Sequence, residues 1–96
     1  MKLLRLSKSD RAGKKLVAVF DMGDGKTRTT HFGSSPYQDY TQHHNIERRT
    51  AYRKRHAKDL LTNDPTRAGF LSFYLLWGDS TSLRENLSAY KKKFDL

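Results

Sequence analysis

One apolar segment limits what this chain can fold into. Between Pro65 and Gly78 a helix would have almost no polar face, because the segment carries the side chains Phe70, Leu71, Phe73, Tyr74, Leu75, Leu76 and Trp77. A helix that is apolar on every side belongs in the middle of a core, and about a dozen residues are too few to span a bilayer. Asp64 is suited to cap this helix, Pro65 to its first position and Gly78 to a left-handed stop.

Residues 1–33 have the pattern of a small antiparallel sheet. Residues 14–22 are rich in valine and short enough for a strand, and residues 26–32 alternate and are β-branched. The Gly-Asp-Gly sequence at 23–25 predicts the turn between them, because glycine accepts positive φ. Residues 2–6 are suited to form a third strand of this sheet.

The remainder of the chain predicts a loop followed by helices. Asn45 is a suitable cap for a helix running to about Leu61, with Glu47 in its first turn. Ser82 and Glu85 form a capping-box pattern ahead of an apolar stripe, made of Leu83, Leu87, Tyr90 and Phe94.

The sequence therefore predicts an α+β fold in a single domain, residues 1–96. A three-stranded antiparallel β-meander (1–33) leads through a loop (34–44) to about three helices packed on one face (45–96). We expect Trp77 and Phe73 in the core, with four apolar side chains around them: Phe20, Phe32, Leu83 and Leu87.

Positive charge is the strongest feature of the composition. The chain has 19 lysines and arginines against 10 acids, a net charge of +9. The bases cluster, since residues 48–58 hold six bases and no acid, and residues 91–93 are three lysines. Such clusters attract phosphate backbones or acidic protein surfaces. The candidate polyanion-binding residues are Arg48, Arg49, Tyr52, Lys54, Arg55, Lys58, Lys91, Lys92 and Lys93.

Helical spacing divides the segment between residues 39 and 58. We expect residues 39–43 to fasten the sheet to the helical part, because Asp39 and Thr41 favour turns and caps. Arg53 interrupts the apolar stripe, so it should turn inward with part of Tyr52. For four other bases the sequence leaves two roles open, an anionic contact or a solvated face: Arg48, Lys54, Arg55 and Lys58.

The histidines do not follow a metal-binding or catalytic spacing. His43 and His44 are adjacent, so their side chains should diverge, and no helical pair of histidines occurs. A histidine-based nuclease would need four residues to converge that no spacing brings together: Asp39, His43, Glu47 and His56. We therefore expect no catalytic residue, no metal, no cofactor and no small-molecule substrate.

An ordered set of short motifs runs through almost the whole chain. The motifs are HFG at 31–33, DYT at 39–41, His43, ER at 47–48, Tyr52, RH at 55–56, Pro65, AG at 68–69, Ser72 and LW at 76–77. This set resembles a family of small, basic, largely uncharacterised proteins encoded by large DNA viruses of algae and protists. The resemblance implies a compact one-domain fold and a viral or virus-derived setting, and it brings no catalytic residues. The sequence departs from the family pattern at Asn45, where that pattern is acidic.

Two non-enzymatic functions follow from the charge and the resemblance. In the first, the protein binds DNA or RNA through phosphate contacts, as a packaging or accessory factor. In the second, it is a minor capsid or cementing protein whose basic faces contact other virion proteins. No apolar run has the length of a membrane span, and no secretory signal is recognisable. We therefore expect the virion or the host cytoplasm or nucleus, without a membrane partner.

Overall fold

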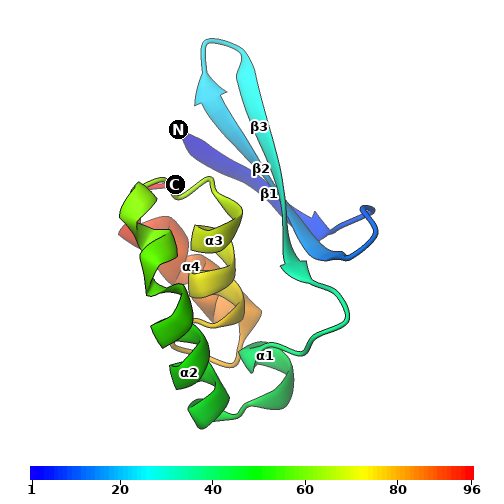
Figure 1. Ribbon diagram of the computed structural model, residues 1–96. Coiled ribbons are helices and arrows are strands. Elements are labelled where there is room, and N and C mark those ends of the chain that lie inside the picture. Colours follow the sequence, from blue (N-terminus) through cyan, green and yellow to red (C-terminus); the bar gives the residue numbers. More distant parts are fainter.

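The computed structural model describes residues 1–96 and begins with the expected sheet (Figure 1). Strands β1 (Lys2–Lys8), β2 (Lys14–Gly23) and β3 (Lys26–Ser34) pair antiparallel in the order β1-β2-β3. In the turn between β2 and β3, Gly23 and Gly25 have φ angles of 89° and 74°. Glycine adopts these angles without steric cost. The predicted β-meander is therefore confirmed.

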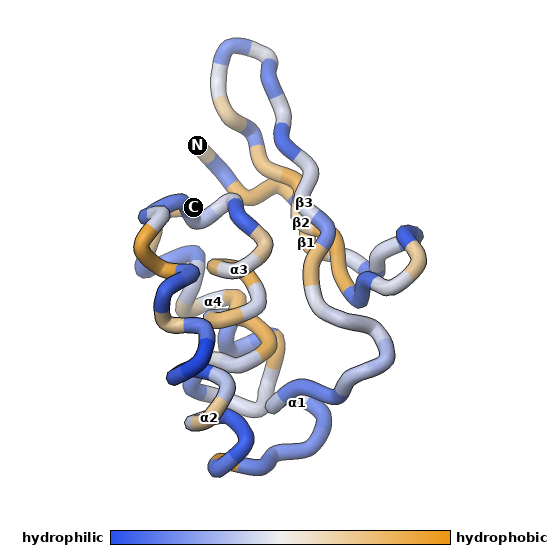
Figure 2. Tube along the Cα trace, in the orientation of Figure 1, coloured by the Kyte–Doolittle hydropathy of each residue, from blue (hydrophilic) through white to orange (hydrophobic).

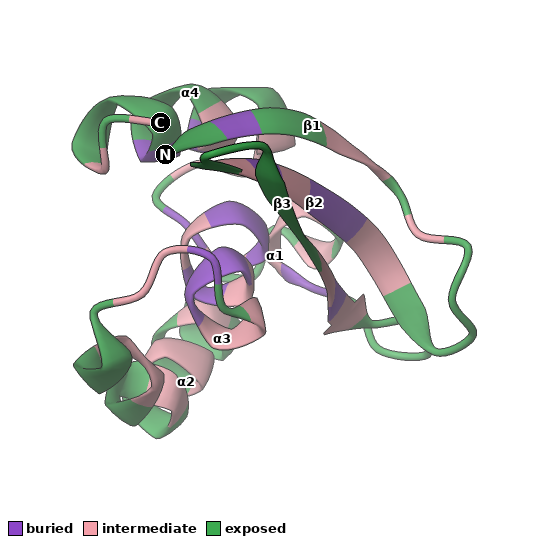
Figure 3. Cartoon of the chain, turned by 90° about the horizontal axis from the view of Figure 1, so that it is seen from above, coloured by how far each residue is buried: buried purple, intermediate pink, exposed green.

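Helical segments follow the sheet and pack on one of its faces (Figures 1 and 3). They are α1 (Tyr40–His43), α2 (Ile46–His56), the 3₁₀ turn η1 (Ala57–Thr62), α3 (Ala68–Leu71), the π-helical turn η2 (Ser72–Leu76) and α4 (Leu83–Lys93). The α+β class is confirmed, with four α-helices where about three were expected. None of the helices is long and apolar enough to cross a membrane.

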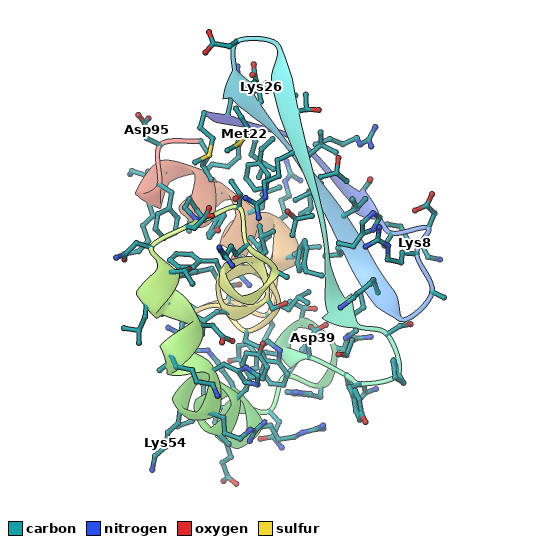
Figure 4. All side chains as sticks on the ribbon, turned by 45° about the horizontal axis from the view of Figure 1, so that its top comes forward. Lys8, Met22, Lys26, Asp39, Lys54 and Asp95 are labelled. Atoms are coloured by element: carbon teal, nitrogen blue, oxygen red, sulfur yellow. The ribbon has the colours of Figure 1, made fainter.

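Part of the predicted loop 34–44 is helical. Helix α1 begins after Asp39, whose carboxylate accepts a hydrogen bond from the N–H of Thr41 at 2.9 Å. The same carboxylate accepts one from Nζ of Lys15 in β2 at 2.6 Å. Figure 4 places Asp39 where the chain leaving β3 reaches α1. Asp39 thus joins the sheet to the helical part, as predicted for residues 39–43.

The core lies between the sheet and the segments α3, η2 and α4. Phe20 and Phe32 are fully buried, as predicted. The main cluster consists of Leu3, Ala18, Phe20, Phe32, Phe70, Leu71, Leu75, Leu76 and Tyr90. Even the hydroxyl of Tyr90 is satisfied, because it donates to the carbonyl oxygen of Pro65 at 2.6 Å. Figure 2 shows this division as apolar colour on β2 and α3 and polar colour along most of α2.

The two rings predicted for the centre of the core lie at its border. Trp77 is only half-buried, and Phe73 is buried but outside the main cluster. Both rings contact α2: Trp77 stacks on Tyr52, and Phe73 lies under the guanidinium of Arg53. That both side chains pack inside the protein was predicted, but that α2 covers them was not.

The apolar helix begins later than predicted. It starts at Ala68 instead of Pro65, because Asp64 caps a turn and not a helix. The carboxylate of Asp64 accepts hydrogen bonds from the N–H of Thr66 at 3.0 Å and from the Thr66 hydroxyl at 2.6 Å. These hydrogen bonds, with the nearby guanidinium groups of Arg28 and Arg67, lower the pKa of Asp64 below its ordinary value.

Gly78 has a different role from the predicted left-handed stop. It is not among the glycines with positive φ. A Cβ atom there would collide with the carbonyl oxygen of Tyr74 and lie 2.9 Å from the side chain of Asn86. The absence of a side chain therefore permits close approach of η2 and α4. Asn86, which the sequence analysis did not single out, is buried and donates to the carbonyl oxygens of Leu75 and Ser80.

The cap of α4 forms as predicted, but only in part. The hydroxyl of Ser82 accepts a hydrogen bond from the N–H of Glu85 at 3.2 Å. The carboxylate of Glu85 does not return to Ser82, since it accepts from the hydroxyl of Ser80 at 2.7 Å. The stripe from Leu83 to Phe94 packs against the core.

Candidate nucleic-acid interface

Two arginines of α2 are bound within the protein. Arg49 donates from Nε to the carbonyl oxygen of Gly78 at 2.6 Å and pairs with Asp79 at 2.7 Å. Arg53 donates to the carbonyl oxygen of Trp77 at 2.9 Å and lies 4.2 Å from the ring centroid of Phe73. The inward position of Arg53 is as predicted, and burial lowers its pKa below the ordinary value.

Arg49 requires a correction. It was predicted to face a polyanion, but its side chain is only 16% exposed. It lies one helical turn from Arg53 and therefore on the same side of α2. Its guanidinium is already occupied by a carbonyl oxygen and a carboxylate, so it is not free for a phosphate.

The other four bases of α2 and η1 have no partner within the protein. These residues are exposed, and their side chains form neither a salt bridge nor a hydrogen bond: Arg48, Lys54, Arg55 and Lys58. Lys54 extends away from the body of the molecule (Figure 4). The sequence left two roles open for these side chains, an anionic contact or a solvated face. Both roles require an exposed side chain, so the exposure of these four residues is compatible with either.

The three lysines at the end of α4 do not join the same surface hollow. All of them are exposed and lack a carboxylate partner. Lys93 lines a hollow with Arg53 and Asp79, and its Nζ atom lies 5.8 Å from the ring centroid of Phe94. Lys91 and Lys92 line neither this hollow nor the groove described next.

A groove of about 520 Å³ runs along α2. Its wall on the α2 side includes Arg48, Tyr52 and Arg55, which lie on one face of the helix at steps of three and four residues. The opposite wall comes from the end of β3 and the following residues, including Tyr37. Its size is that of a small-ligand site. An adjoining hollow of about 580 Å³ also has basic side chains but is lined by no phenylalanine, tyrosine or tryptophan, so the groove is distinguished by its aromatic wall.

A column of stacked rings forms one wall of the groove. Tyr52 stacks between His56, at a centroid distance of 4.1 Å, and Trp77, at 4.2 Å and an interplanar angle of 5°. His43 lies at the end of the column, 5.2 Å from Trp77 and tilted by 56°, and does not itself line the groove. Burial in this column raises the pKa of Tyr52 to about 12. Tyr52 was predicted to turn inward in part, and both faces of its ring are covered.

His43 has an unusual hydrogen-bonding state. Its Nδ1 atom accepts from the N–H of Asn45 at 2.9 Å, which requires that nitrogen to be unprotonated. Its Nε2 atom is buried without a partner. Burial, and then the positive charge of Arg48, lower the pKa of His43 below 6.5. His43 is therefore held neutral beneath the basic surface.

His56 and Asp59 form a pair at the edge of the groove. Their Nδ1 and Oδ2 atoms are 3.0 Å apart, and a Cβ on Gly69 would lie 2.9 Å from the Asp59 side chain. No group of three or more histidine, aspartate or glutamate side chains lies close enough to hold a metal ion. What the groove offers chemically is charge, rings and hydrogen bonds.

The groove keeps a positive excess after its internal ion pairs are formed. Lys15 is paired with Asp39, which leaves Asp59, hydrogen-bonded to His56, as the other carboxylate of the groove. The cations that line the groove without a carboxylate partner are Lys14, Arg48 and Arg55. The arrangement therefore suits an anionic ligand.

Fold and site together define a small basic α+β protein with an aromatic groove beside an arginine-bearing helix. The chain belongs to the family of unknown function DUF5754, which it matches over residues 4–56. This region spans nearly all of the sheet together with α1 and α2. No curated protein and no solved structure matched the chain.

Most of the motif residues noted in the sequence line this groove. They are Phe32, Gly33, Asp39, Arg48, Tyr52, Arg55, His56, Ala68, Gly69, Ser72, Leu76 and Trp77. Their convergence on one groove was not predicted. The available signal was the spacing of 48, 52, 55 and 59, which is one face of a helix continuing into η1. Tyr37 and Lys14, which also line the groove, had no signal of this kind.

Proposed function

We propose that the protein binds nucleic acid through phosphate contacts made by the exposed side of α2 and η1. One observation supports this most strongly: the four bases Arg48, Lys54, Arg55 and Lys58 are free, while the two arginines beside them are bound internally. Arginine forks match phosphate oxygens, and lysine adds mobile positive charge. The net charge of +9 attracts the same partner at longer range.

In this proposal the protein is non-enzymatic and acts as a packaging or accessory factor in a viral or virus-derived setting. A basic surface also suits an acidic protein, such as a neighbouring virion component. Phosphate binding differs in its salt dependence, because each neutralised phosphate releases counterions from the nucleic acid. The salt dependence of binding therefore separates a nucleic acid from an acidic protein as the partner.

The test compares two variants that lose equal charge. The first carries Arg48→Gln, Lys54→Gln, Arg55→Gln and Lys58→Gln. The control carries four substitutions at other exposed bases that line none of the described hollows: Lys2→Gln, Arg5→Gln, Lys26→Gln and Arg84→Gln. Mobility-shift titrations with duplex DNA are made over a range of salt concentrations.

For the unaltered protein, the logarithm of the binding constant should fall with the logarithm of salt at a slope of about −3 to −4 if four phosphates are neutralised. The α2 variant should lose most of this slope and affinity, and the control should keep most of both. Equal losses would show that only net charge matters. Absence of binding at low salt, to DNA and RNA alike, would overturn the proposal and favour an acidic protein partner.

A further inference from the structure

We infer that the groove beside α2 receives an unpaired nucleotide, so that the protein prefers single-stranded nucleic acid to a duplex. The base would stack on Tyr37, and the flanking phosphates would bind Arg48 and Arg55. This inference rests on the proposed function, and it adds a location and a strand preference to it.

The groove has the size and the charge that an unpaired nucleotide needs. Its volume of about 520 Å³ lies within the range of about 300–1,000 Å³ that is usual for sites of small organic ligands. Arg48 and Arg55 are seven residues apart on one helical face, so they are separated by about 10 Å along the helix axis. Two cations at this separation can contact the backbone on both sides of one inserted base.

Tyr37 is the ring that is available for stacking. It lines the groove, is 71% exposed and belongs to none of the aromatic pairs within the protein. Tyr52 cannot serve in the same way, because both faces of its ring are already covered. An exposed tyrosine beside free arginines is the combination that single-strand binders use, since every base has a face that stacks.

Unpaired polar groups complete the groove. The side chains of Gln38 and Ser34 line it, are exposed and form no hydrogen bond within the protein. They can therefore bind the edge of a base that has left its pair. In a duplex the base faces are stacked on one another, so they are not accessible for stacking on a ring such as Tyr37. The groove walls thus distinguish a single strand from a duplex, whereas the outer lysines do not.

The test uses an oligothymidine strand and a duplex of equal length as probes. Tyr37→Ala removes the stacking ring, and Tyr37→Phe retains it. Ala51→Leu fills part of the groove from an exposed position on α2 without adding a ring that could stack on a base. Leu61→Ala is the matched control, since Leu61 is 80% exposed and does not line the groove.

The unaltered protein should bind the single strand more tightly than the duplex. Tyr37→Ala should weaken single-strand binding about tenfold, as loss of one stacked base does, and leave duplex binding unchanged. Ala51→Leu should also weaken single-strand binding. Tyr37→Phe and Leu61→Ala should behave as the unaltered protein does. None of the altered side chains lies in the core, so each variant should fold.

The outcomes separate this inference from the proposed function. If single strand and duplex bind equally and Tyr37→Ala changes neither, the groove is not used, but phosphate binding by α2 stands. If Ala51→Leu leaves single-strand binding intact, the inference is likewise overturned. If neither probe binds at low salt, the proposed function fails as well.

Discussion

Helix α2 carries two pairs of arginines in eight residues, and their environments are opposite. Arg49 and Arg53 bind the carbonyl oxygens of Gly78 and Trp77, whereas Arg48 and Arg55 have no partner. The carbonyls in question follow the last turn of η2, where a helix lacks internal donors. All four side chains are arginines, so their position relative to such carbonyls decides whether each stabilises the fold or remains available to a ligand.

The largest effect on stability is expected when the ring beneath Arg53 is removed. Phe73 is 4% exposed and lies against that guanidinium. Phe73→Ala should lower the free energy of unfolding by about 3–5 kcal/mol, because it leaves a cavity in a buried site. Urea unfolding followed by circular dichroism measures this. Phe73→Leu, which keeps most of the burial, should cost less, and equal stability of Phe73→Ala and the unaltered protein would contradict the assignment.

Arg53→Ala tests the inward pair directly. It leaves the carbonyl oxygen of Trp77 without its donor and removes the cation–π interaction with Phe73. We expect a decrease in the free energy of unfolding of about 2–3 kcal/mol, the range for a hydrogen bond with a charged donor together with a cation–π interaction. Arg55→Ala is the matched control and should change stability by less than about 0.5 kcal/mol, as at other exposed positions. Similar decreases for both would remove the distinction between the two sides of α2.

The outward pair should show the reverse behaviour. Arg48→Gln or Arg55→Gln should leave stability within about 0.5 kcal/mol and reduce the magnitude of the salt slope of binding by about 0.7–0.9 for each phosphate that is no longer neutralised. Arg84→Gln, on the exposed side of α4, is the control for charge alone. A variant with unchanged slope would show that its arginine does not bind phosphate.

The smallest effect concerns pH and the neutral histidine under the outward pair. Because the pKa of His43 is below 6.5 in the folded protein, the unfolded chain binds the proton more readily. Stability should therefore rise with pH through the window just below 6.5 and fall on acidification through it. His43→Gln should weaken this dependence, as measured by thermal unfolding at pH 7.5 and at lower pH values. Asp64 does not contribute there, because its lowered pKa places its loss of stability below 3.8.

The charges around His43 determine the sign of that effect. Burial lowers the pKa of His43, and the neighbouring Arg48, His44 and Lys15 lower it further. Asp39 alone raises it. A pH dependence that is the same in the unaltered protein and in His43→Gln would place the titrating group elsewhere.

Local patterns made much of the fold predictable from sequence. The β2–β3 turn depends on two nearby glycines that accept positive φ, and the caps at Asn45 and Ser82 depend on side chains a few residues away. The inward position of Arg53 followed from the helical stripe alone. Each of these features requires only neighbours in the sequence, which is why the sequence contains them.

Interactions between distant segments account for what was missed. The role of Arg49 depends on the carbonyl of Gly78, and the border position of Trp77 depends on Tyr52. The late start of α3 depends on the hydrogen bonds of Asp64 with Thr66. In the sequence alone, an aspartate followed by proline looks the same whether it caps a turn or a helix. The groove requires β3, α2 and η2 to come together, and no periodicity within one element reports that.

Trp77 is the only tryptophan of the chain, and it lies in the groove wall in parallel contact with Tyr52. Its indole emission should therefore respond to whatever enters the groove, and the chain carries an optical reporter at the one place where occupancy matters. Binding there can be followed by intrinsic fluorescence, without a dye on either the protein or its partner.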